Sequence, residues 1–348
     1  MSAFTRCGVA DKYLGRRILD AQPGGDPFSV QAGDKRMNIS VILCTFDRCE
    51  TLAKALESVA ASVLPDNLPW EVLVVDNNSR DQTRQVAEGF CQRYPGRFRY
   101  LFEPCQGKSH ALNAGIREAR GDILAFIDDD LTVEPTWLQN LIAPLLSGAW
   151  AGSGGRILPE PTFIAPLWLP LQEPRALAPF AFFDLGPEAG ELAEPPFGAN
   201  MAFRREAFEK HGGFRTDLGP QPGNQIRSED SEFGARLLKA GERLRYEPGA
   251  IVYHKISANR LQKNYFLVWW FDKARADIRA FGVSRRDRWR LGGIPLVFFR
   301  RLIVWTLRWL VAVEPSRRFS CKLSVWVVAG QILECYRQKP RPWTGGIR

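Results

Sequence analysis

The chain has 348 residues, of which 45% are hydrophobic and 24% charged, so a disordered or collagen-like protein is excluded and about two domains are expected. The formal net charge is +9, but residues 273–348 alone hold 17 basic and 4 acidic residues. The seven cysteines include no CxxC pair and no zinc-like spacing with histidine, which indicates a reducing compartment. We expect neither a secretory signal nor a membrane-spanning helix.

From residue 38, short apolar runs alternate with segments of helical periodicity, which is typical of βαβ units and a mostly parallel sheet. The strands expected in this half, with helices between them, are 39–44, 70–76, 97–103 and 122–127. Segment 156–197 carries nine prolines and predicts a long surface loop without regular elements. A helix is expected at 228–240 with Ser228 as its N-cap, and 243–254 predicts two short strands about a Pro-Gly turn.

The end of the chain is rich in tryptophan, phenylalanine and arginine. Residues 294–313 predict an amphipathic helix on which Arg301 and Arg308 share a face, with Arg300 one position round, and 321–337 repeats the pattern more weakly. Three interpretations stay open: packing under the preceding domain, nucleic-acid binding, and contact with an anionic membrane. The nearly continuous apolar runs favour the membrane over nucleic acid.

Polar clusters follow three of the expected strands. They are Thr45-Phe46-Asp47, Asp76-Asn77-Asn78-Ser79 and Asp128-Asp129-Asp130. The carboxyl ends of parallel strands meet at one rim, which is where open α/β sheets bind ligands. Asp128 and Asp130 can face one side of an extended segment, and such oxygen ligands suit Mg²⁺ or Mn²⁺ bound to substrate phosphates. The alternative is a solvated acidic turn.

Five segments together resemble glycosyltransferase family 2, the inverting nucleotide-sugar transferases of the GT-A fold. In chain order they are VILCTFDR (41–48), VLVVDNNSRDQT (72–83), GKSHALNAGIREARGDILAFIDDD (107–130), FGANMAFRREAF (197–208) and SEDSEFGARLLKAG (228–241). The resemblance covers about 39–254. It implies a Rossmann-like, mostly parallel sheet flanked by helices. The apolar and basic pattern of the end of the chain adds the expectation of an amphipathic, membrane-associating helical tail.

The resemblance also implies which residues bind the donor nucleotide. The expected contacts are Thr45 and Asp47 in the nucleotide pocket, Asp76 at the base, Asp128 near the ribose, and Lys108 and Asn113 on the same rim. Asp47 stands where the family more often has asparagine, which could alter these contacts.

On the other side of the expected cavity, the resemblance makes Asp230 the general base that deprotonates the acceptor hydroxyl, with Glu229 as its support. Asp130 would hold Mn²⁺ or Mg²⁺ on the diphosphate. His254 would be a metal or diphosphate contact, or else an ordinary histidine at the end of a strand. The acids after 122–127 and those opening the helix at 228–240 must then share one cavity.

The sequence therefore predicts an N-terminal extension (1–37), a GT-A catalytic domain (38–258, with a nucleotide half 38–130 and an acceptor half 131–258) and a basic helical region (259–348). The predicted activity is metal-assisted transfer of one sugar to a hydroxyl of a lipid-linked or polysaccharide acceptor. No QxxRW signature of processive synthases is present, which favours single addition. The expected location is the inner face of the cell membrane, with no nucleic-acid partner. The alternative is a catalytically silent sugar-nucleotide-binding or assembly subunit. A dinucleotide oxidoreductase is excluded because no GxGxxG follows the first strand.

Overall fold

The structure is a computed structural model that describes residues 18–19, 38–166, 168–169, 177–283 and 289–338. The described residues form two compact units. Unit 1 contains those up to Phe163 together with 177–216 and Glu229–Ile256, and unit 2 contains 164–169, Asp217–Ser228 and the rest from Ser257. The predicted boundaries of the extension, catalytic domain and tail stay predictions.

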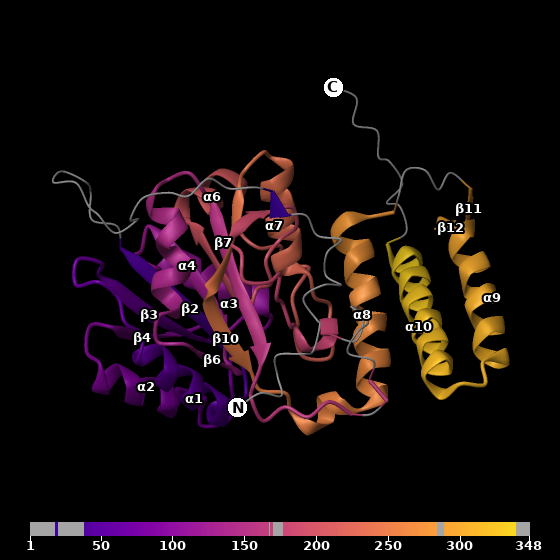
Figure 1. Cartoon of the computed structure of the whole chain (residues 1–348), viewed down its shortest axis with the longest axis horizontal. Helices are drawn as coiled ribbons and strands as arrows, with labels where there is room; N and C mark the ends of the chain where they lie inside the picture. The colour runs from indigo at the N-terminus through magenta and orange to yellow at the C-terminus, as the bar shows by residue number, and fades with distance from the viewer. Residues whose placement is uncertain (1–17, 20–37, 167, 170–176, 284–288, 339–348) are drawn as a thin grey trace. The chain divides into compact units, whose positions relative to one another are not determined.

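The first half of unit 1 is a parallel sheet with strand order β4, β3, β2, β5 (Figure 1). The strands are β2 (Ile39–Thr45), β3 (Trp70–Asp76), β4 (Phe98–Phe102) and β5 (Ile123–Asp128). The helices between them are α1 (Cys49–Ala60), α2 (Thr83–Arg93) and α3 (Lys108–Glu118). The central strands are continuous apolar runs because helices cover both faces of a parallel sheet. The predicted α/β class is thus confirmed.

The second half of unit 1 extends this sheet through one reversed strand. Strand β9 (Asn200–Arg204) is antiparallel to both β5 and β7 (Gly152–Pro159), and β7 is parallel to β10 (Leu244–His254). Antiparallel β8 (Gly190–Leu192) and β6 (Leu131–Val133) also pair with β10, and β1 (Ile18–Leu19) pairs with β8. Because β9 is reversed, the chain that precedes it reaches the carboxyl end of β5.

Two predictions about this half are wrong. Residues 244–254 form one strand, because Pro248 and Gly249 lie in a bulge between Glu247 and Ile251 and not in a turn. Within 156–197, strand β7 runs to Pro159, and β8 and the short 3₁₀ helix η2 (Ala178–Phe180) are regular elements. Phe180 and Phe183 are fully buried, so the stretch around η2 packs into unit 1 and is not a surface loop, whereas Ile164, which belongs to unit 2, is 83% exposed.

The described residues of unit 1 form three further helices, namely α4 (Trp137–Leu146), α6 (Arg205–His211) and α7 (Glu229–Lys239). Helix α7 begins one residue after Ser228, its predicted N-cap. Ser228 has a φ of 79°, in place of the extended backbone of an ordinary cap, and its hydroxyl lies 3.4 Å from Asp277 Oδ1. The predicted helix is confirmed and Ser228 directly precedes it, but with a backbone conformation unlike that of an ordinary cap.

Unit 2 consists mainly of α8 (Lys263–Phe281), α9 (Leu296–Val311) and α10 (Pro315–Arg337), with the short elements η3 (Ala258–Leu261), β11 (Arg290–Leu291) and β12 (Ile294–Pro295). Helix α10 packs against both α8 and α9 (Figure 1). The predicted helices at 294–313 and 321–337 are confirmed, the second with an earlier start. In the described ranges, none of the helices combines the length and the hydropathy that crossing a bilayer requires.

Candidate active site

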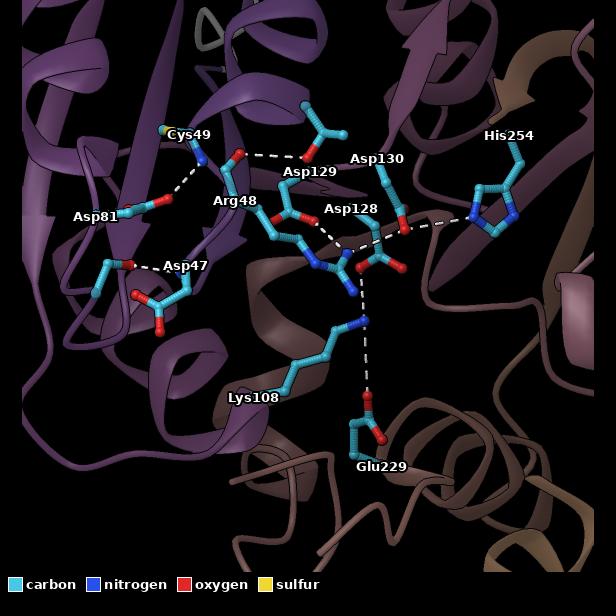
Figure 2. Close-up of polar contacts among 12 residues, drawn as sticks. Asp47, Arg48, Cys49, Asp81, Lys108, Asp128, Asp129, Asp130, Glu229 and His254 are labelled. Carbon is cyan, nitrogen blue, oxygen red and sulfur yellow. Dashed lines mark hydrogen bonds and ion pairs between the residues drawn. The ribbon is translucent and has the colours of Figure 1, made fainter. Parts of the chain in front are cut away.

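The polar ends of β2, β3 and β5 lie side by side at one rim of the sheet. Thr45 pairs in register with Asp76, and Cys44, one residue earlier, pairs with Asp128. The sequence prediction that these strand ends converge is therefore met in the structure. Figure 2 shows the three aspartates at the end of β5 pointing toward Arg48, which precedes α1, Lys108 of α3 and His254 of β10.

Lys108 connects the two halves of this rim. It is the first residue of α3, and its Nζ lies 2.5 Å from Asp128 Oδ1 and 3.8 Å from Glu229 Oε1 (Figure 2). Burial opposes a charge on this lysine, but the carboxylates of Asp128 and Glu229 outweigh it and raise its pKa above the ordinary value. The acids at the end of β5 and at the start of α7 thus share one cation, as the predicted common cavity requires.

Glu229 is a buried carboxyl group at this junction, with 4% of the residue exposed. Burial raises the pKa of Glu229 to about 7; Lys108 opposes this shift, while Asp230 adds to it. The group consequently changes its charge near neutral pH, close to the carboxylates of Asp128 and Asp230.

Asp230, the predicted base, is held rigidly by backbone donors. The N–H of Gly198 donates to Oδ2 at 2.7 Å, and the N–H of Ser231 donates to Oδ1 at 2.6 Å. An added Cβ at Gly198 would lie 2.9 Å from Oδ2, so glycine is required for the loop to approach this closely. The contact fixes the start of α7 to the segment before β9.

Arg48, the residue that follows Asp47, ties together two of the three consecutive acids. Its Nη1 lies 2.9 Å from Asp129 Oδ1 and 3.0 Å from Asp130 Oδ2. Burial raises the pKa of Asp129 to about 6, although Arg48 and the hydroxyl of the buried Thr45 both act to lower it. Sequence reasoning missed Arg48; its only local signal is its place beside the polar end of the first strand.

Asp130 also meets His254, the last residue of β10. His254 Nδ1 lies 2.6 Å from the carbonyl oxygen of Phe180, so Nδ1 carries a hydrogen and donates it. The other nitrogen, Nε2, lies 3.4 Å from Asp130 Oδ2. In the neutral tautomer Nε2 presents a lone pair toward a carboxylate oxygen, and a backbone carbonyl orienting the opposite nitrogen is the usual support of a metal-binding histidine.

These two side chains fit a divalent cation that takes further ligands from a substrate. In the described part of the chain, no three His, Cys, Asp or Glu side chains gather as a metal-binding set. Mg²⁺ and Mn²⁺ typically use one or two protein carboxylates together with substrate phosphates and water, so a protein pair is compatible with either ion.

Two of the predicted nucleotide contacts, Asp47 and Asp76, belong to a second cluster at the ends of β2 and β3. Asp76 accepts hydrogen bonds from the Tyr100 hydroxyl and the Ser79 N–H, both at 2.9 Å. The Asp47 N–H donates to Ser79 Oγ at 3.0 Å, and Asp47 Oδ1 accepts from the Arg80 N–H at 2.6 Å. These hydrogen bonds order the ends of β2 and β3 (residues 45–47 and 76–80) into one surface, the ledge.

Asn113 lies apart from this cluster in its contacts. Its side-chain amide donates to the carbonyl of Phe214 at 2.8 Å and accepts from the N–H of the same residue at 2.9 Å. This pair of hydrogen bonds holds the chain after α6 against α3. The predicted donor-nucleotide contact of Asn113 stays a prediction.

Asp81 is a further residue that the sequence reasoning did not select. Its carboxylate accepts from the N–H of Cys49 at 2.9 Å and from the N–H of Thr83, also at 2.9 Å. Burial opposes the charged form, but these bonds and that of the Thr83 hydroxyl lower the pKa of Asp81 to about 2. Asp81 thereby fixes the starts of α1 and α2, one on each side of the ledge.

Comparison with solved structures identifies the architecture. The mannosyltransferase PcManGT of Pyrobaculum calidifontis, in complex with GDP-Man and Mn²⁺, superposes with a TM-score of 0.62 at 18% identity, over 94% of this chain and 93% of that one. GalNAc-T7 with UDP, GalNAc and Mn²⁺ gives 0.54 at 15% identity, over 88% and 59%. At these identities the likeness establishes the fold alone, which is GT-A.

Sequence comparison supplies the family. The model of Glycosyl transferase family 2 matches residues 40–212, and that of Glycosyl transferase family group 2 matches 188–335. The succinoglycan biosynthesis protein ExoM of Rhizobium meliloti is 28% identical over 65% of this chain and 70% of its own length. The glucosyl-dolichyl phosphate glucuronosyltransferase of Haloferax volcanii is 26% identical over 66% and 73%. The chain belongs to glycosyltransferase family 2 and is an enzyme, a glycosyltransferase.

Proposed function

We propose that the enzyme transfers one sugar, with inversion, from a nucleoside diphosphate donor to a hydroxyl of a lipid-linked or polysaccharide acceptor, assisted by Mn²⁺ or Mg²⁺. The observation that carries this proposal is the contact of Lys108 with both Asp128 and Glu229. It joins the nucleotide side of the rim to the side that carries Asp230. A transferase needs its nucleotide-binding residues and its general base within reach of the same sugar.

Relatives with known activities support the substrate class. One is named for biosynthesis of succinoglycan and another for glucuronosyl transfer to a glucosyl-dolichyl phosphate, which are a polysaccharide and a lipid-linked acceptor. A structural neighbour was solved with a nucleotide sugar and Mn²⁺. We therefore extend a nucleotide-sugar donor and these two acceptor classes to this chain.

The acceptor side of the proposed reaction depends on Asp230. Its Oδ1 accepts from the N–H and the hydroxyl of Ser231, whereas Oδ2 accepts from the Gly198 N–H. A carboxylate oxygen can accept two hydrogen bonds, so Oδ2 can take the acceptor's proton as the acceptor oxygen attacks the anomeric carbon. The two backbone donors hold the carboxylate in one orientation. Attack from the face opposite the leaving diphosphate inverts the anomeric centre.

The donor side of the reaction depends on Asp130 and His254. These two side chains would hold the cation, whose charge offsets the negative charge that develops on the departing diphosphate. Arg48 keeps Asp130 and its neighbour Asp129 in place. Asp47, Asp76 and Asp128, with Lys108 and Thr45, would bind and orient the nucleoside along the ledge.

For the enzyme's location, we propose a peripheral site on the inner face of the cell membrane. A lipid-linked acceptor would be presented at that surface, and the basic, aromatic-rich end of the chain supplies a means of attachment.

Donor and metal binding can be tested by thermal shift with UDP or GDP, each with and without Mn²⁺. We expect one nucleotide to stabilise the enzyme further when Mn²⁺ is added. Asp130→Asn and His254→Ala should each remove the Mn²⁺-dependent part, whereas Asp66→Asn, an exposed control on the same unit, should not. A full Mn²⁺ response in both site variants would contradict the metal assignment.

Catalysis can be tested by nucleotide release with UDP-glucose or GDP-mannose as donor and polyprenyl phosphate or a glycan as acceptor. Asp230→Asn should keep the nucleotide-induced thermal shift but lose at least about 100-fold in turnover, as general-base removal typically does. The anomeric configuration of the product, measured by NMR, should be inverted. Retention, or an active Asp230→Asn enzyme, would overturn the mechanism.

A further inference from the structure

Helix α9 in unit 2 has two unlike faces. Phe298, Leu302 and Trp305 pack with Val328 of α10 in a small apolar core. The opposite face carries aliphatic side chains that contact little: Leu296, Ile303, Val304, Leu307, Leu310 and Val311 are all exposed, the last two by 64% and 75%. Their spacing of three and four residues places them on one side of the helix. Val313, just after the helix, is 93% exposed.

The same exposed side is strongly basic. Arg300, Arg301 and Arg308 are exposed, and no acidic residue occurs between Leu296 and Val313. Arg290 before the helix and Arg317 and Arg318 after it are exposed as well. From Arg290 to Lys322 the only acidic residue is Glu314.

A continuous apolar face of this kind marks a contact surface, because it is larger than the scattered apolar residues of an ordinary surface. Its charge decides among the possible occupants. Arg300 lies within the aliphatic face, at a spacing of four from Leu296 and of three from Ile303. A second copy of this chain would bring one basic face against another, whereas an anionic bilayer offers phosphates to the guanidinium groups and acyl chains to the aliphatic groups.

We propose that the outer face of α9 docks the enzyme onto an anionic membrane surface, with the helix lying in the plane of the head groups. The aliphatic side chains enter the boundary between head groups and acyl chains. The arginines extend along them and end among the lipid phosphates. This inference specifies the surface behind the peripheral location in the proposed function and rests on that location, but it requires no particular donor, metal or acceptor.

Cosedimentation of the full-length protein with vesicles tests the proposal, without donor or acceptor present. We expect binding to phosphatidylcholine vesicles that contain phosphatidylglycerol and much weaker binding to pure phosphatidylcholine. The triple change Arg300→Gln, Arg301→Gln and Arg308→Gln should weaken binding by on the order of 100-fold. Each basic residue near an anionic surface contributes a similar amount to the binding free energy, so the three losses add. The triple change Ile303→Gln, Leu307→Gln and Leu310→Gln should weaken it at least about tenfold, and should do so also at high salt.

A matched control removes the same charge elsewhere. Arg84→Gln, Arg93→Gln and Arg117→Gln, all exposed in unit 1, should leave vesicle binding within about twofold of wild type, because these arginines are not part of the α9 face. The single changes Arg308→Gln and Leu310→Gln replace the triple variants if either of these melts at a lower temperature. Failure of wild type to bind anionic vesicles, or equal losses in the control triple, would overturn the proposal. A dimer in sedimentation equilibrium that the aliphatic variant dissociates would assign the face to a second copy.

The outcome is separable from that of the transferase assignment. If the enzyme does not bind vesicles but shows normal nucleotide-induced thermal shifts, only the proposed docking through α9 is rejected. Normal vesicle binding without any nucleotide response would instead reject the proposed function and leave the docking surface in place.

Discussion

The ammonium group of Lys108 lies 3.8 Å from the carboxylate of Glu229, so that the first residue of α3 meets the first residue of α7. Lys108 also contacts Asp128, and the cluster is largely shielded from water. Low polarity strengthens both the attraction within the cluster and the cost of any unpaired charge. We therefore expect the protonation state of Glu229 to affect both stability and activity.

Glu229→Gln should change the pH dependence of stability. The pKa of Glu229 is raised from its ordinary value of 4.5 to about 7, so between these values the folded state binds more protons than the unfolded state. The free energy of unfolding then falls as pH rises through this window, by about 3 kcal/mol in total. Glu229→Gln removes this fall, so its stability relative to wild type should increase from about pH 5 to about pH 8.

Urea unfolding at several pH values measures the effect, with Glu209→Gln on the surface of α6 as the control. If ionised Glu229 is needed to orient Lys108, turnover of the wild type should also rise with pH near 7, and this limb should disappear in Glu229→Gln. A constant stability difference at all pH values would contradict the shifted pKa.

Arg48→Ala should destabilise the rim. It removes a guanidinium nitrogen that contacts both Asp129 and Asp130, of which Asp129 is buried. Because Arg48 itself is 44% exposed, we expect a moderate loss of about 1–2 kcal/mol in the free energy of unfolding. Arg48→Lys should recover part of it, since one nitrogen makes both contacts. The exposed pair of Arg84 with Glu88 gives the control Arg84→Ala, for which less than about 0.5 kcal/mol is expected. Equal effects of the two alanine variants would contradict the assigned role.

Gly121→Ala should be among the most disruptive small changes in unit 1. An added Cβ would lie 2.4 Å from the Ser40 nitrogen and 2.7 Å from the Ile39 carbonyl carbon, both in the backbone of β2 and unable to move aside. We expect a loss of about 2–3 kcal/mol in thermal or urea unfolding. Gly89→Ala in α2, where nothing lies within 4 Å of the added atom, should stabilise by up to about 1 kcal/mol. A neutral Gly121→Ala would show that β2 and the chain before β5 can separate without cost.

Glu334→Gln should weaken the packing of α8 on α10. The carboxylate is fully buried and lies 2.7 Å from Arg279 Nη2 and 3.3 Å from Arg275 Nε. Removing its charge leaves two guanidinium groups without their shared anion, at an expected cost of about 3 kcal/mol. Glu314→Gln, at the exposed start of α10, serves as the control and should change little. Hydrogen exchange of α10 amides would locate the loss; unchanged protection there would disprove it.

The parallel half of the sheet was predictable from the sequence because its strands are uninterrupted apolar runs bounded by polar turns. The predicted range 70–76 matches β3 residue for residue. The bulge in β10 was not predictable, since Pro248 and Gly249 give the same local signal whether the chain turns or continues. The distinction depends on the neighbouring strand β7, which pairs with β10 on both sides of the bulge.

For the site, the sequence identified the acids but not their counter-ions. Carboxylates directly after buried strands stand out in a sequence because they are adjacent and repel one another. Arg48 meets Asp129 across 81 positions of the chain, and its place beside the polar end of the first strand does not by itself identify this partner. Only the paired strands β2 and β5 bring these residues together. The roles assigned to the site residues stay predictions until the variants are measured.

The reversed strand β9 also affects how the protein is made. During synthesis β2, β3, β4 and β5 emerge first and can pair with one another, but β5 keeps an open edge until residues 200–204 have left the ribosome. Unpaired sheet edges readily join other chains, so the nascent enzyme passes through an interval of exposure to aggregation. Slow translation before β9 emerges would prolong this interval, and a chaperone acting at that stage would protect the chain. A fragment ending before residue 200 should be recovered largely as insoluble material.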